Sequence, residues 1–254
     1  MDLGDVAFLL AAGLAAGAVN AVAGGGSLVT YPTLLVIGLP PVAANVTNAI
    51  GVFPGYLGAV LGSRLDLVGQ GDRARRLVLT AALGGGAGAA ILLLAPERVF
   101  ELVVPFLVLG ASATLAFQDQ LRALVGHPET GSRRRRTVAL HLVVGLASIY
   151  GGYFGAALGV LLVALIALVV AETMARVSAL KNLVSAVVGL ITVVVFAVFG
   201  PVEWLAALVL APATVIGGYV GARTARKLPH GLWKGLIAGF GTLIGVILLI
   251  QAFT

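Results

Sequence analysis

Polar side chains are scarce inside the long apolar segments of this sequence, and most of those present can donate hydrogen bonds. Asn45, Thr47 and Asn48 share one helical turn, and Lys181 and Asn182 occupy a comparable turn later in the chain. Amide, hydroxyl and ammonium groups bind anions by donating hydrogen bonds to them. These residues therefore predict a binding site for a small anion.

Two apolar segments, residues 6 to 38 and 137 to 171, are longer than one membrane crossing requires and are interrupted by glycine. We expect each to form two half-helices, with the second halves beginning near Ser27 and Ala156. Their free N–H groups and positive dipole ends would face an anion, which glycine allows to approach the backbone closely. Close packing of helices through small residues is the alternative explanation of the glycines.

The candidate substrate-binding residues are the glycines of the two breaks, the polar residues that flank them and those of the two comparable turns. They are Asn20, Gly24, Gly25, Gly26, Ser27, Tyr31, Asn45, Thr47, Asn48, Gly151, Gly152, Tyr153, Lys181 and Asn182. Lys181 has a second interpretation, because it follows Arg176 closely and could extend to the membrane interface. Asn48 and Asn182 could instead bridge neighbouring helices.

The residues that catalytic and metal sites usually need are absent from the apolar segments. The chain has no cysteine, and its ten carboxylates lie in connecting segments or near segment ends. No acid pair, metal-ligand spacing or nucleophile with a base is present, so we expect no enzyme and no metal or cofactor site. The run Gly24 to Gly26 is not a phosphate-binding loop, because no Lys-Ser or Lys-Thr pair follows it.

The elements that would position the site follow from composition. Of the 254 residues, 60% are hydrophobic and 10% are charged, which excludes a soluble globular domain. The apolar segments are residues 6 to 38, 41 to 62, 74 to 95, 98 to 118, 137 to 171, 174 to 199, 202 to 222 and 231 to 252. This pattern predicts an all-α polytopic membrane protein.

Glycine, asparagine and proline recur at nearly constant offsets along the chain, which predicts an internal duplication. The matched positions are Gly17 with Gly145, Gly24 with Gly152, Asn48 with Asn182, Gly55 with Gly189, Gly84 with Gly217 and Pro96 with Pro229. We expect a first transmembrane repeat at residues 1 to 118 and a second at 137 to 254. Residues 119 to 136, which are polar and basic, form the expected linker.

Basic residues predict the orientation, because they accumulate at cytoplasmic ends of spans. If each glycine-broken segment is a re-entrant hairpin followed by three transmembrane helices, the second repeat is inverted. Of the 16 basic residues, 14 then share one side, with Arg98 opposite and Lys181 inside the protein. We therefore expect two inverted repeats in the cell membrane, with the loop Arg133 to Arg136 in the cytoplasm and both termini outside. A nucleic-acid or anionic-lipid patch is the less favoured interpretation of that loop.

Four stretches of the sequence together resemble the sulfite exporter TauE/SafE family, also called the TSUP family. They are GAVNAVAGGGS from Gly17, LPPVAANVTN from Leu39, GGYFGA from Gly151 and ALKN from Ala179. The resemblance covers essentially the whole chain. It implies transport of sulfur-containing or organic anions such as sulfite, sulfonates or sulfoacetate, without fixing which anion or which direction.

We therefore expect a secondary transporter for such an anion, working by alternating access around a midplane site between the two breaks. A passive anion channel is the alternative, and a membrane-embedded enzyme or assembly factor is a more distant one. The expected partners are the anionic substrate and the lipid bilayer, with no nucleic acid. The sequence is compatible with a homo-oligomer and leaves the coupling ion open.

Overall fold

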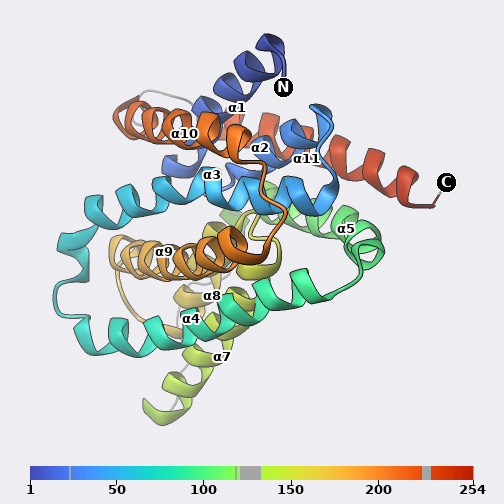
Figure 1. Cartoon of the computed structure of the whole chain (residues 1–254). Helices are drawn as coiled ribbons and strands as arrows, with labels where there is room; N and C mark the ends of the chain where they lie inside the picture. Colours follow the sequence, from blue (N-terminus) through green and yellow to red (C-terminus); the bar gives the residue numbers. More distant parts are fainter. Residues whose placement is uncertain (23, 118, 121–132, 225–229, 254) are drawn as a thin grey trace.

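The computed structural model describes the chain except for residues 23, 118, 121–132, 225–229 and 254, and its regular structure within the described residues is helical (Figure 1). The long helices are α1 (Leu3–Val22), α3 (Pro41–Gly62), α4 (Gly71–Leu94), α5 (Glu97–Ala116), α7 (Arg133–Tyr153), α9 (Met174–Phe199), α10 (Trp204–Thr224) and α11 (His230–Phe253). The short ones are α2 (Ser27–Val36), α8 (Leu158–Val169) and the 3-10 helix η1 (Arg64–Leu67). The predicted all-α fold is confirmed.

Within the described residues, four helices are long and apolar enough to cross a membrane, namely α4, α5, α9 and the part of α1 over Leu3–Asn20. Shorter apolar stretches occur in α2, α8, α10 and α11. Large apolar side chains cover much of the outer surface; Leu94, for example, is 84% exposed and Phe199 is 76% exposed. A surface of this kind faces lipid rather than water. The chain is therefore a polytopic membrane protein, as predicted.

Prolines set two of the helix boundaries. Pro41 is the first residue of α3, and Pro96 directly precedes α5. Proline suits the first turn of a helix, because its fixed φ is already helical and its missing N–H would have no partner there. The polar residues of α3 therefore begin one turn inside a sharply defined helix start.

Both long apolar segments are broken, as glycine predicts. Helix α1 ends at Val22 and α2 begins at Ser27, as expected. The second break contains Gly155, which has a φ of 75° and belongs to the glycine cluster that predicts the break, and α8 begins at Leu158, close to the expected Ala156. Gly151 and Gly152 differ from the prediction, because α7 continues through both to Tyr153. The helix tolerates Gly152 because this residue packs on another backbone: a Cβ there would lie 2.1 Å from the carbonyl oxygen of Gly85.

The start of α7 corrects a second expectation. Arg133 to Arg136 form the first turn of α7 rather than a loop. Arginine is a good helix former, and its long side chain can reach water from a helix end. Helix therefore replaces the last four residues of the expected linker, and residues 121 to 132 of that linker lie outside the described part of the chain.

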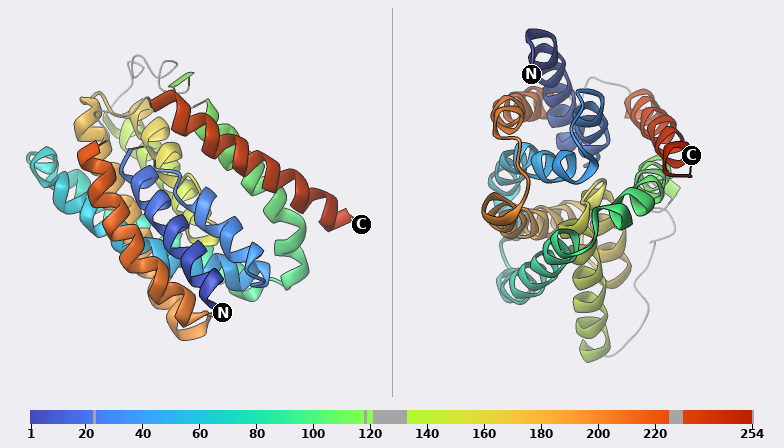
Figure 2. Two further views of the ribbon diagram at one scale, coloured as in Figure 1. Left: turned by 90° about the horizontal axis from the view of Figure 1, so that it is seen from above. Right: turned by 45° about the vertical axis from the view of Figure 1, so that its right-hand side comes forward.

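Helices distant in sequence pack in pairs, often through glycine. Helix α1 lies along α10, where a Cβ on Gly17 would be 2.1 Å from the carbonyl oxygen of Thr214. Helix α7 lies along α4, and α3 contacts both α9 and α10. Figure 2 shows α5 and α11 side by side at the edge of the molecule. The two halves of the chain are thus interlocked, which brings the two broken segments together.

Candidate functional site

The two breaks are in backbone contact, and Lys181 lies beside that contact. A Cβ on Gly24 would lie 3.4 Å from the Cα atom of Gly159, and a Cβ on Gly159 would lie 3.5 Å from Nζ of Lys181. Gly24 has a φ of 86°, which glycine adopts without strain. The starts of the two half-helices and one ammonium group therefore gather in a single place.

Side chains of α1, α2 and α3 hold the first break. The Oδ1 atom of Asn20 accepts a hydrogen bond of 2.8 Å from the N–H of Gly26, which satisfies one of the free donors at the start of α2. The hydroxyl of Thr30 donates to Oδ1 of Asn48. A Cβ on Gly26 would lie 2.4 Å from the carbonyl oxygen of Ala16, so a side chain does not fit there. The first break is therefore held by α1, through Asn20, and by α3, through Asn48.

Side chains from α2, α3 and α7 hold the second break. The Nδ2 atom of Asn45 donates a hydrogen bond of 2.9 Å to the carbonyl oxygen of Tyr153. The hydroxyl of Tyr150 donates one of 2.5 Å to the carbonyl oxygen of Ala156. The ring of Tyr31 packs edge to face on Phe154, with centroids 5.3 Å apart. The first half of the chain thus shapes the break in the second half.

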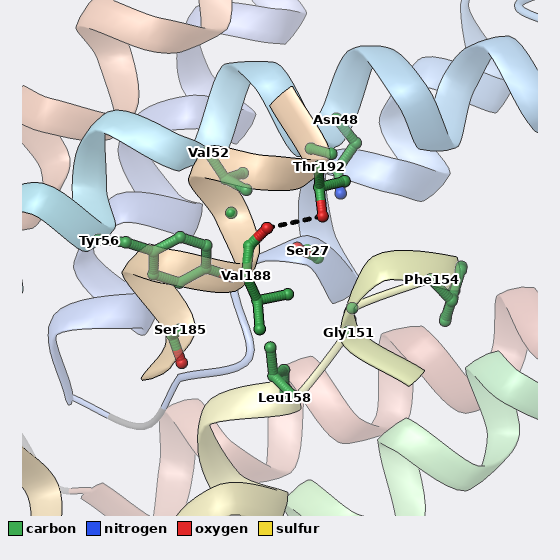
Figure 3. Close-up of a pocket in the computed structure, with 13 residues that line it drawn as sticks. Ser27, Asn48, Val52, Tyr56, Gly151, Phe154, Leu158, Ser185, Val188 and Thr192 are labelled. Atoms are coloured by element: carbon green, nitrogen blue, oxygen red, sulfur yellow. Dashed lines mark hydrogen bonds between the residues drawn. The ribbon is translucent and has the colours of Figure 1, made fainter. Parts of the chain in front are cut away.

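A small cavity lies between the two breaks and helices α3 and α9 (Figure 3). Its polar lining residues are Ser27, Asn48, Tyr56, Ser185 and Thr192. Its volume is about 30 Å³, which holds about two water molecules. The described residues that line it include no carboxylate and no basic side chain, so its hydrogen-bonding groups are neutral.

Ser185 presents a hydroxyl at this cavity that has no hydrogen-bond partner among the described residues. The residue is 1% exposed. Tyr31 OH and Asn45 Oδ1 are also buried and unpartnered within the described part of the chain. Leaving a buried polar group unsatisfied costs about 1 to 3 kcal/mol. A water molecule or an anion in the cavity would give the Ser185 hydroxyl a partner.

Lys181 and the cavity lie along one face of α9. Lys181, Ser185, Val188 and Thr192 follow one another at helical spacing, and the last three line the cavity. Lys181 precedes Ser185 by four residues, about 6 Å along the helix axis. The ammonium group therefore lies next to the cavity rather than in its lining, at the side where Gly24 meets Gly159.

Three of the predicted site residues have other partners. The Oγ1 atom of Thr47 accepts a hydrogen bond of 3.0 Å from the N–H of Glu203. The Nδ2 atom of Asn182 donates one of 3.0 Å to Oγ of Ser63, which bridges α9 to the end of α3. Gly152 faces α4, as described above. These three contacts are structural, and none of the three residues lines the cavity.

The structure places the remaining candidates around the breaks. Ser27, Asn48 and Gly151 line the cavity. Gly24 contacts Gly159 beside Lys181, whereas a Cβ on Gly25 would lie 3.1 Å from the side chain of Leu115. The contacts that hold the two breaks in place involve Asn20, Gly26, Tyr31, Asn45 and Tyr153.

Sequence reasoning missed several residues at this place, including Tyr56, which lines the cavity. Others are Thr30, Phe154, Gly159, Ser185 and Thr192. The helical spacing of Lys181, Ser185 and Thr192 was a usable signal, since three polar residues on one face of an apolar helix are uncommon. Gly159 gave no such signal, because it is one glycine among 35 in the sequence.

This arrangement favours negative charge. The N-terminus of a helix carries roughly half a positive charge, and here two of them lie beside an ammonium group. Among the described residues, no cluster of three or more His, Asp or Glu side chains could hold a metal ion. The chemistry available is therefore hydrogen bonding and electrostatic attraction of an anion.

Comparison with known proteins yields one family and several relatives. The family described as "Sulfite exporter TauE/SafE" matches residues 9–248. A "Probable membrane transporter protein" of Haemophilus influenzae is 26% identical over 88% of this chain and 87% of its own length. "Probable membrane transporter protein ORF9" of a Sinorhizobium species is 25% identical over 96% of this chain and 92% of its own. "Probable membrane transporter protein YfcA" of Escherichia coli K12 is 24% identical over 92% and 84%. No solved structure matches the chain.

Proposed function

The chain belongs to the sulfite exporter TauE/SafE family of membrane transporters, and we propose that it is a secondary transporter for a small sulfur-containing or organic anion. Sulfite, sulfonates and sulfoacetate are the anions that the family resemblance suggests. The family consists of transporters, so the protein is not an enzyme.

One observation carries this proposal: Gly24, Gly159 and Lys181 meet at the starts of α2 and α8. An anion that leaves water loses strong hydration, and hydrogen bonds from backbone N–H groups and an ammonium replace part of it. The hydroxyls of Ser27 and Ser185 and the amide of Asn48 extend the donor set into the cavity. We assign these residues to the anion path, with Asn20, Tyr31 and Asn45 positioning the breaks.

We further propose that the two halves are inverted repeats that move against each other. Three sets of contacts support this proposal. Helix α1 packs on α10 through Gly17 as α7 packs on α4 through Gly84 and Gly145. Helix α3 packs on α9, and α5 packs on α11. In the proposed duplication, α1 corresponds to α7, α3 to α9, α4 to α10 and α5 to α11. Exchanging the two halves then turns the α1–α10 contact into the α7–α4 contact and leaves the α3–α9 and α5–α11 contacts unchanged.

The orientation in the cell membrane belongs to the same proposal. The basic residues would face the cytoplasm, because 14 of 16 share one side in the inverted-repeat topology. Single cysteines introduced at Val68, Ala95 and Phe253 can test this, since the chain has no native cysteine. An impermeant reagent should label positions 95 and 253 in intact cells and spare position 68. The reverse pattern would overturn the orientation.

The size of the cavity supports a carrier over a channel. At about 30 Å³ it holds about two water molecules, so an anion with three or four oxygens needs the walls to separate. A site that must widen to admit its substrate suits alternating access, whereas a channel conducts through a standing opening.

Ligand-dependent thermal stability of the purified protein tests the proposal. A compound that binds only the folded state raises stability by mass action. Sulfite, sulfonates or small carboxylates should raise the unfolding temperature. The sodium, potassium and choline salts of one inert anion should all give the same unfolding temperature. Stabilisation by cations alone would contradict an anion site.

A further inference from the structure

A second cavity, of about 660 Å³, lies where α4 and α7 begin and α8 ends. It shares no lining residue with the small cavity between the breaks. Helices α4 and α7 touch deep in the molecule, where a Cβ on Gly88 would lie 2.1 Å from the carbonyl oxygen of Ile149. Figures 1 and 2 show them spreading apart towards their first turns. The cavity is the wedge that this divergence opens, and we refer to it as the α4–α7 wedge.

The α4–α7 wedge has a basic rim. Three arginines, Arg73, Arg76 and Arg136, line it together with one acidic residue, Asp72, which leaves two positive charges. Arg73 is already engaged, because it donates to Glu172 at 3.2 Å and to Gln70 at 3.1 Å. Within the described residues, no carboxylate lies within 4.0 Å of the guanidinium groups of Arg76 or Arg136. These two arginines are therefore available to an anionic ligand.

The inner wall of the α4–α7 wedge is apolar. Leu77 and Leu140, which are 1% and 6% exposed, close it from α4 and α7, and Val169 and Val170 line it from the end of α8. Along α7, Thr137 follows Arg136 directly and His141 follows Leu140, and both also line the wedge. A basic rim above an apolar wall matches a ligand with a charged head and a hydrocarbon chain, rather than a fully water-soluble anion.

The depth of the basic rim also points to lipid. Helix α4 spans Gly71–Leu94, so Arg76 and Arg73 lie about 10 and 14 Å from its midpoint at 1.5 Å per residue. Half of a typical hydrocarbon core is about 15 Å. With the midpoint of α4 at the centre of the bilayer, the long side chains of these two arginines extend to the level of the phosphate groups of one leaflet.

We propose that the α4–α7 wedge binds an anionic phospholipid, with Arg76 and Arg136 donating hydrogen bonds to its phosphate and one acyl chain lying on Val169 at the apolar end of the wedge. Two guanidinium groups suit a phosphate because each presents paired N–H donors. The lipid would tie the start of α4 to the start of α7. These helices come from different halves of the chain.

Stability of the purified full-length protein in detergent, titrated with phosphatidylglycerol or with phosphatidylcholine of the same acyl chains, tests this site. Phosphatidylglycerol should reach its half-maximal stabilising effect at a concentration at least about tenfold lower, because its head group carries net negative charge. The double variant R76Q/R136Q should lose that preference. Inorganic phosphate should not stabilise at the same concentrations; equal stabilisation would mean that the wedge takes a free anion, which overturns the lipid proposal.

The matched control is R64Q/R75Q, which removes the same charge from two exposed arginines nearby that do not line the wedge. It should keep the preference for phosphatidylglycerol within about twofold. If the control loses the preference as fully as R76Q/R136Q, general surface charge explains the effect and the site is refuted.

A measurement on the unaltered protein covers the case in which R76Q/R136Q does not fold. Phosphatidylglycerol with a photoreactive group on its acyl chain should label residues of α4 from 71 to 77 and of α7 from 136 to 141. Excess phosphatidylglycerol should compete this labelling and phosphatidylcholine should not. Labelling confined to other helices contradicts the proposal.

Discussion

Gly24 and Gly159 bring the two interrupted segments into backbone contact, since a Cβ on either would lie 3.4 Å from the Cα atom of the other. One glycine precedes α2 and the other lies in the first turn of α8. Two positive helix ends are thereby placed together, beside Lys181. Such an arrangement stabilises a bound ligand electrostatically only if the ligand is negatively charged or strongly dipolar.

The first prediction concerns the space at Gly159. Alanine should be tolerated, because its Cβ would meet neighbours at ordinary contact distance, whereas valine adds methyl groups towards Gly24 and Nζ of Lys181. We expect Gly159→Val to reduce transport at least about tenfold, with folded yield close to that of Gly159→Ala. Gly58→Val is the control, because a Cβ there meets nothing within 4 Å. Similar transport in Gly159→Val and Gly58→Val would argue against an anion path at this contact.

The second prediction concerns the charge of Lys181. Lys181→Gln should weaken anion binding by about 1.5 to 3 kcal/mol, the range for a hydrogen bond to a charged group. Lys181→Arg should be only partly functional, because the wider guanidinium must fit beside Gly159. Titration calorimetry of both variants would measure this. An affinity of Lys181→Gln within twofold of the parent would remove the residue from the site.

The third prediction separates two buried serines. The hydroxyls of Ser185 and Ser148 both lack hydrogen-bond partners among the described residues, but only Ser185 lines the cavity. Ser185→Ala should weaken anion binding by about 0.5 to 1.5 kcal/mol, the net value of one hydrogen bond. Ser148→Ala should leave affinity unchanged. Equal affinities in the two variants would exclude Ser185 as an anion ligand.

The fourth prediction assigns Gly152 to packing rather than binding. Gly152→Ala should lower the yield of folded protein strongly, because its Cβ would lie 2.1 Å from the carbonyl oxygen of Gly85. Gly86→Ala should fold normally, since its nearest contact would be 3.5 Å away, on Ile191. Size-exclusion chromatography after expression compares the two. Normal yield of Gly152→Ala would contradict the close packing of α7 on α4.

The sequence predicted the first break and many of the residues around it, because glycine runs and isolated polar residues stand out in an apolar chain. It placed the start of α2 at Ser27, where the structure has it. It also predicted the second break, which contains Gly155, but wrongly included Gly151 and Gly152 in it. Tertiary packing of Gly152 on Gly85 stabilises the helix there, although glycine disfavours helix locally. Thr47 and Asn182 were candidates for the site, but their side chains bond to Glu203 and Ser63. These partners are distant in sequence, so the sequence alone did not reveal the contacts.

Counterflow in proteoliposomes tests the central claim most directly, using the anion that stabilises the purified protein most. Unlabelled anion inside the vesicles should accelerate and transiently concentrate labelled anion from outside, because a carrier returns loaded faster than empty. Lys181→Gln should reduce this exchange at least about tenfold, while Gly58→Val should not. Labelled anion that merely equilibrates, unaffected by unlabelled anion inside and by Lys181→Gln, would contradict a carrier built on the meeting of the two breaks.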